Sequence, residues 1–228
     1  MTDKEIVEKV NIVLKRVDDF FNVANVVPES YKQTKEQSGG GQFVYRNLWL
    51  RDKNHQIKPN QNMFSFSADD IDKYKIPSYV VGCSGRANLF AKYAKEIGLQ
   101  DVFIVPCVKI SDIGNQNMDG HQIVAVKMSS GLQLLNPASG VHTFERAKIN
   151  AACKVNEQID AAQHGRPEYR IAAILTPSEH EKITSREQLM QIYNRVSRIQ
   201  KFQSATNKIK DRLKHTKLFQ KIFQSEND

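Results

Sequence analysis

Residues 82–98 read Gly-Cys-Ser-Gly-Arg-Ala-Asn-Leu-Phe-Ala-Lys-Tyr-Ala-Lys-Glu-Ile-Gly and place a glycine-flanked cysteine directly before an apolar helical pattern. The apolar positions that repeat with the helical period are Ala87, Leu89, Phe90, Ala91, Tyr93, Ala94 and Ile97. Gly98 follows them, and glycine most readily takes the left-handed conformation that ends a helix. We therefore predict a helix from Arg86 to Ile97 with Cys83 at its N-terminus.

A cysteine at a helix N-terminus has an environment that favours its anion. The first backbone N–H groups of a helix have no partner within the helix, and the helix dipole is positive at that end. Such placement lowers a cysteine pKa from about 8.5 toward neutrality. The same N–H groups can stabilise an oxyanion when a carbonyl is attacked. Cys83 is therefore the candidate nucleophile.

A predicted hairpin brings a histidine and an asparagine together. His121 begins an apolar run that reads as a strand over residues 121–128, Ser129-Ser130-Gly131 supplies a turn, and residues 132–135 return as the antiparallel partner. Because the two legs have similar length at about 3.4 Å per residue, Asn136 is expected beside His121. We predict that the Asn136 side chain accepts the Nδ1 proton of His121 and leaves Nε2 facing the thiol.

These motifs, Gly-Cys before a helix with Leu-Phe and Ile-Gly, then His-x-x-Val-x-Val and Leu-Leu-Asn-Pro, resemble the transglutaminase-like branch of the papain-fold cysteine enzymes. The resemblance covers roughly residues 77 to 140. It implies that Cys83 is the nucleophile, His121 the base and Asn136 the third catalytic residue. That branch usually has aspartate before the proline, whereas papain-like proteases use asparagine. The resemblance implies acyl transfer on amide bonds through a thioester, by a protease, a glutamine deamidase or a transglutaminase, with a protein or peptide as substrate.

Two alternatives stay open at this stage. Asn88-Leu89-Phe90 is similar to a segment of the arylamine N-acetyltransferases, which share the same core and transfer an acetyl group. In the other alternative the core has kept its fold and lost its activity, because cysteine is often buried for packing alone and Asn136-Pro137 is an ordinary turn. Such a relic would act as a docking module for a membrane or a protein.

The remaining cysteines and histidines do not suggest a second site. Cys107 lies in an apolar run and Cys153 has no glycine flank, so we expect both to be inert. Three cysteines without disulfide spacing, and no secretory segment, favour a reducing, cytoplasmic location. No paired cysteine or histidine motif indicates a metal or another cofactor. Ser38-Gly39-Gly40-Gly41 lacks the lysine of a phosphate loop, and His142 is a reserve candidate for the base.

Most of the excess positive charge lies at the end of the chain. Residues 182–228 contain 11 Lys or Arg and 4 Asp or Glu, whereas the whole chain has a formal net charge of +8. We predict a catalytic domain over residues 1–178 and a basic helical extension over residues 179–228. Thr184 or Ser185 is expected to cap the first helix of the extension, with Gln188 completing a capping box, and Ser204 to cap a second helix. The second helix either binds an anionic membrane surface or an acidic protein, or packs its apolar face on the catalytic core and exposes its charges to solvent. Sequence-specific nucleic-acid binding is not expected, because no reading motif accompanies the charge.

The rest of the pattern predicts an α+β fold. Thr2 to Asn25 reads as an amphipathic helix that packs on the core, and Trp49 reads as a core residue. Strands are expected at residues 101–110, 121–128, 132–135 and 169–175, mostly antiparallel. We predict a papain-like core in which the nucleophile helix packs on this sheet, and the site lies where that helix begins beside the strand of His121.

Overall fold

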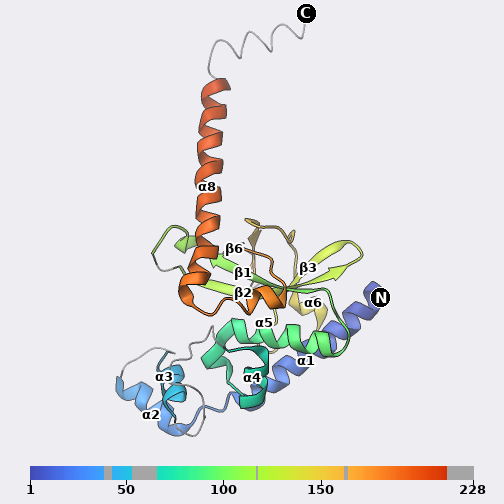
Figure 1. The fold of residues 1–228 in the computed structure, drawn as a ribbon, viewed down its shortest axis with the longest axis vertical. Helices are drawn as coiled ribbons and strands as arrows, with labels where there is room; N and C mark the ends of the chain where they lie inside the picture. Colours follow the sequence, from blue (N-terminus) through green and yellow to red (C-terminus); the bar gives the residue numbers. More distant parts are fainter. Residues whose placement is uncertain (39–42, 53–65, 117, 162–163, 215–228) are drawn as a thin grey trace, which may run out of the picture.

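A computed structural model describes residues 1–38, 43–52, 66–116, 118–161 and 164–214, with side chains placed as far as residue 208. Helices pack against one antiparallel sheet, which confirms the α+β prediction (Figure 1). The helices are α1 (Asp3–Ala24), α2 (Glu29–Ser38), α3 (Phe43–Arg51), α4 (Ala68–Tyr74), α5 (Ser78–Glu96), α6 (Phe144–Ala147), α7 (Pro177–His180) and α8 (Arg186–Lys214), with a short 3₁₀ turn at Ile110–Asp112. None of the helices described has the length and apolarity needed to cross a membrane.

The sheet contains β1 (Val102–Lys109), β2 (Gly120–Met128), β3 (Gly131–Leu135), β4 (Lys148–Ile149), β5 (Gln158–Ile159) and β6 (Tyr169–Ile171). Its spatial order is β4-β3-β2-β1-β6-β5, and every neighbouring pair is antiparallel. The long strands β1 and β2 lie at the centre, and the tight turn at Ser129-Ser130 joins β2 to β3. The predicted strands at residues 101–110, 121–128 and 132–135 are therefore confirmed within one or two residues.

The predicted strand at residues 169–175 is shorter than expected because Pro106 lies opposite its middle. Ala172 donates its N–H to the carbonyl of Pro106, but proline has no N–H with which to return a hydrogen bond. Pairing resumes where Ile104 and Leu175 exchange two backbone hydrogen bonds. The register of β1 and β6 would place Ile174 at that position, so one extra residue forms a bulge after Ile171.

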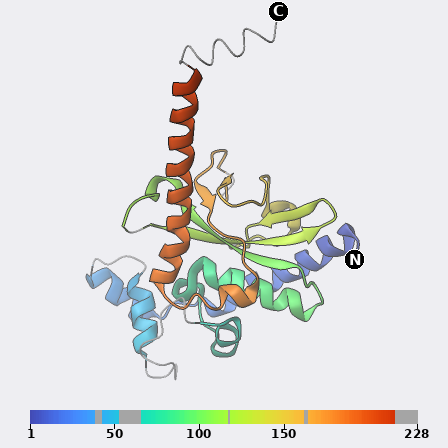
Figure 2. The ribbon, with the colours of Figure 1, turned by 45° about the horizontal axis from the view of Figure 1, so that its top comes forward.

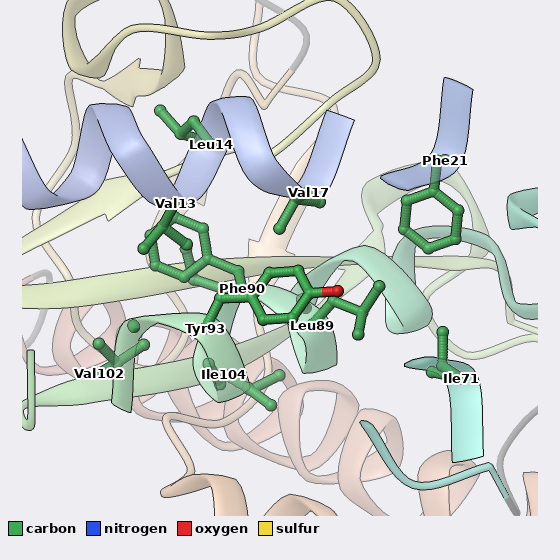
Figure 3. Packing of buried hydrophobic residues seen from close by; sticks show 14 of the residues in the cluster. Val13, Leu14, Val17, Phe21, Ile71, Leu89, Phe90, Tyr93, Val102 and Ile104 are labelled. Carbon is green, nitrogen blue, oxygen red and sulfur yellow. The ribbon is translucent and has the colours of Figure 1, made fainter. Parts of the chain in front are cut away.

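Two helices cover one face of the sheet and form the main core with it. The predicted N-terminal helix is confirmed: Thr2 forms a capping box with Glu5, and α1 ends before Asn25. Figure 3 shows buried side chains of α1 and α5 in the cluster that these helices form with β1. The labelled residues come from α1, α4, α5 and β1 and are Val13, Leu14, Val17, Phe21, Ile71, Leu89, Phe90, Tyr93, Val102 and Ile104. Trp49 belongs to the same cluster, 4% exposed and edge-on to Phe66, as predicted for a core residue.

The C-terminal segment departs from its prediction. Thr184 and Ser185 bond to the side chain of Gln188, as expected at the start of a helix. The prediction of a second helix capped by Ser204 is wrong, since α8 continues through Ser204 to Lys214. No glycine or proline interrupts residues 186–214, and a serine caps a helix only where some other feature has ended the previous one.

Only the first part of α8 packs on the sheet. Leu189, Tyr193 and Val196 form a small cluster with Val108 of β1, and the remainder of α8 extends away from the body in both views (Figures 1 and 2). Phe202 on the extending part is 75% exposed. The boundary at residue 178 between a catalytic domain and a basic extension stays a prediction. Binding of the basic extension to a membrane or an acidic protein also stays a prediction.

Candidate active site

Gly82 sets the start of the helix that carries Cys83. Helix α5 contains one residue with non-helical dihedral angles, Gly82, at φ 59° and ψ −149°. This conformation is accessible to glycine and strained for other residues. A side chain at Gly85 would overlap Val81, so the turn before Gly82 packs closely on the helix after it. Cys83 is consequently the first residue of the longer helical segment, as the glycine flank predicts.

The register of β2 and β3 brings His121 and Asn136 together. Val124 pairs with Leu135, so one further step places Asn136 across from Ile123 and diagonal to His121 on the same face. The Nε2 atom of His121 lies 3.1 Å from Oδ1 of Asn136. The spacing of 15 residues in the hairpin therefore produces the contact predicted from sequence.

A second contact of Asn136 determines which ring nitrogen faces the thiol. Its Nδ2 donates to the carbonyl oxygen of Ala161 at 2.7 Å. Because a carbonyl oxygen only accepts, the amide oxygen must face His121, and Nε2 must carry the proton that it accepts. The Nδ1 atom is then left for Cys83, whose side chain is hydrogen-bonded to His121. The predicted use of the two nitrogens is therefore wrong, and the roles of Nδ1 and Nε2 are exchanged.

The end of β3 frees a backbone N–H group for the sulfur of Cys83. Backbone hydrogen bonds between β1 and β2 include those donated by Lys109 and Lys127, which are odd-numbered. Because backbone groups alternate in direction along a strand, the N–H and C=O groups of odd-numbered β2 residues point toward β1, and those of even-numbered residues point toward β3. Gln122 points the same way, but β3 has ended at Leu135. Its N–H donates instead to Cys83, which also receives the N–H of Ser84. The sulfur thus lies at the free edge of β2.

The pKa values of Cys83 and His121 shift in the directions that favour an ion pair between them. Burial raises the pKa of Cys83, but the hydrogen bond and charge of His121, with the N–H groups of Gln122 and Ser84, together bring it below its ordinary value. Burial lowers the pKa of His121, yet its contacts with Cys83 and Asn136 raise it overall. Both shifts favour a thiolate beside an imidazolium.

Tyr169 of β6 lies against the histidine and was not found from sequence. Its ring centroid is 5.6 Å from that of His121, with an interplanar angle of 39°. An aromatic ring beside an imidazolium is electrostatically favourable. A tyrosine in a short strand carries no signal for this contact, which depends on the pairing of β6 with β1.

The other candidate residues have environments that do not favour catalysis. Burial raises the pKa of Cys107 well above its ordinary value and that of Cys153 to about 11, which makes both poor nucleophiles at neutral pH. His142, the reserve base, contacts Asp18 instead, with its Nε2 at 2.7 Å from the carboxylate. The loop at 39–41 lies outside the described residues. Among those described, no group of three or more histidine, cysteine and acidic side chains is placed to hold a metal ion.

No family model, curated protein or solved structure matches this chain. The function is therefore inferred from the geometry of Cys83, His121 and Asn136.

Proposed function

We propose that the chain is a cysteine-dependent acyl-transfer enzyme that acts on amide bonds, built on a papain-like, transglutaminase-like core. The observation that carries the proposal is one continuous series of hydrogen bonds, from Cys83 through His121 and Asn136 to the carbonyl of Ala161. Each member fixes the next, so the imidazole is oriented before a substrate arrives. A nucleophile, a base and an orienting group held in this way are what covalent catalysis requires.

The mechanism follows from the protonation states. The Cys83 thiolate attacks the carbonyl carbon of an amide, and the N–H groups of Ser84 and Gln122 stabilise the negative oxygen. The imidazolium of His121 then gives its Nδ1 proton to the leaving amine, the C–N bond breaks and a thioester remains. His121, now neutral, takes a proton from the second nucleophile as that nucleophile attacks the thioester. Water gives hydrolysis or deamidation, and an amine gives a cross-link.

The acetyltransferase and the inactive relic are the competing assignments. An acetyltransferase would use the same three residues and differ in its acyl donor, so substrates separate the two. A relic has no need for a lowered cysteine pKa, and the pKa shifts of Cys83 and His121 favour a functional pair.

Incubation of a glutamine-containing model protein with the enzyme, with and without an added primary amine, identifies the reaction. A mass increase of 1 Da indicates deamidation, because oxygen replaces NH.

Alkylation by iodoacetamide provides the direct test of the nucleophile. We expect Cys83 to react at neutral pH while Cys107 and Cys153 stay unmodified, because only Cys83 has a lowered pKa. Peptide mass spectrometry after timed alkylation between pH 5 and 9 measures each site. The His121→Ala variant is the control and should move the alkylation midpoint of Cys83 upward. A Cys83 that reacts no faster than a free thiol would support the relic.

Substitutions of Asn136 test its role as orienter. Asn136→Ala removes one hydrogen bond to a charged ring, which costs about 1.5–3 kcal/mol, or about 10- to 150-fold in kcat/KM. Asn136→Asp should keep part of the activity, because aspartate retains the acceptor for Nε2 of His121 but cannot donate a hydrogen bond to the Ala161 carbonyl. A carboxylate stabilises the imidazolium more than an amide does, so the pKa of His121 rises and the basic limb of the pH profile moves to higher pH. A folded but inactive Asn136→Asp would contradict the assignment.

A further inference from the structure

At position 120, directly before His121, the surrounding atoms leave no space for a side chain larger than that of glycine. Gly120 is not among the residues with positive φ, so its backbone does not require glycine. A Cβ at this position would overlap the hydroxyl of Tyr193 and would lie 2.5 Å from Cζ of that ring and 2.6 Å from the carbonyl oxygen of Cys107. The tyrosine therefore occupies the volume that a side chain at position 120 would need.

Tyr193 reaches this position from the packed part of α8. It is 2% exposed and belongs to the cluster that includes Val108 of β1 and Met118, two residues before Gly120. Burial raises the pKa of Tyr193, so its side chain stays a neutral phenol over the pH range in which Cys83 and His121 titrate. A rigid, buried ring at the start of β2 limits how far that end of the strand can move.

The backbone of His121 is held at the same point. In the register of β1 and β2, Cys107 lies opposite His121, and this odd-numbered pair exchanges backbone hydrogen bonds. The Cys107 carbonyl is also one of the groups that a side chain at Gly120 would approach too closely. Tyr193, Gly120 and Cys107 thus meet at the junction from which the imidazole is directed toward Cys83.

We propose that Tyr193 is a positioning residue for His121, and that α8 supports the active site through this one side chain. The proposal rests on the proposed function of Cys83 and His121. Tyr193 acts by filling the space above Gly120 and holding the first residues of β2 against β1. Loss of the ring lets the strand end relax, and the imidazole then no longer meets the sulfur at hydrogen-bond distance.

The test measures the pH dependence of Cys83 alkylation in Tyr193→Leu. We expect the midpoint to rise by about one pH unit, which corresponds to about tenfold slower alkylation on the acidic limb. Gly120→Ala should give a shift in the same direction, since its methyl group displaces either the ring or the strand. Adding Tyr193→Leu to Gly120→Ala relieves the contact with the ring but not that with the Cys107 carbonyl oxygen, 2.6 Å from the new Cβ, so the double variant should keep a raised midpoint.

Leu189→Ala provides the matched control. Leu189 is 7% exposed in the same cluster, also on α8, but it is not among the atoms nearest Gly120. This variant should lower the melting temperature and leave the alkylation midpoint unchanged. A Tyr193→Leu variant that loses stability without a change in midpoint would overturn the positioning role. If wild-type Cys83 itself reacts like a free thiol, the proposed function fails before the role of Tyr193 is in question.

Discussion

Replacement of Cys83 by alanine is expected to abolish turnover, with a loss of about 10⁴-fold or more in kcat. No other described cysteine can take over the reaction, because burial raises the pKa values of both Cys107 and Cys153. Cys83→Ser should be nearly as inactive, since a serine hydroxyl is far less acidic than a thiol and His121 alone would have to remove its proton.

The measurement is the release of ammonia or amine from the substrate that the glutamine assay identifies. Mass spectrometry of the quenched enzyme should also show the thioester in wild type and not in Cys83→Ala. Cys153→Ser is the matched control, because Cys153 is also partly exposed and should be dispensable. Retention of wild-type activity in Cys83→Ala would refute the nucleophile assignment, whatever the state of the fold.

The position of Cys83 and the pairing of His121 with Asn136 could be predicted because both depend on local sequence. A glycine, a helical period and a closing Gly98 define where a helix begins and ends, and a hairpin of two equal legs brings its ends together. Neither inference needs contacts between distant segments. The same holds for the capping box of Ser185 and Gln188.

The features that sequence did not reveal depend on contacts between distant segments. The choice of Nε2 as the nitrogen bonded to Asn136 follows from Ala161, 25 residues further along the chain. The backbone N–H of Gln122 is available to the Cys83 sulfur because β3 ends before it can pair with this residue. The ring of Tyr169 reaches His121 through the pairing of β6 with β1. The apolar pattern of these strands specifies burial and not register.

A buried carboxylate joins the segments that carry Cys83 and Asn136. The side chain of Asp18 on α1 is 3% exposed, and it accepts hydrogen bonds from the Arg86 side chain at 3.3 Å and the backbone N–H of Gly140 at 3.0 Å. Arg86 lies one turn after Cys83, and Gly140 lies in the loop that follows Asn136. Asp18 therefore contributes to the spacing between the nucleophile and its orienting group.

Replacement of Asp18 by alanine is expected to lower the free energy of unfolding by about 3–5 kcal/mol, since it leaves the buried guanidinium of Arg86 without its partner. Urea denaturation measures this loss. Asp19→Ala is the matched control: Asp19 is the adjacent residue, its ion pair with Lys15 is exposed, and its loss should cost at most about 1 kcal/mol. Equal losses in the two variants would contradict a structural role for Asp18.

The pH dependence of stability provides an independent measure of the same carboxylate. Burial raises the pKa of Asp18, but the hydrogen bonds from His142, Gly140, Asn22 and Arg86 bring it below the ordinary aspartate value. A lowered pKa contributes stability above the ordinary value, and that stability is lost as pH falls through the native one. Asp18→Asn should therefore be less stable than wild type at neutral pH and lose less on acidification, so the two stability curves converge as pH falls below the ordinary aspartate pKa. Parallel curves would show that Asp18 does not titrate as a stabilised carboxylate.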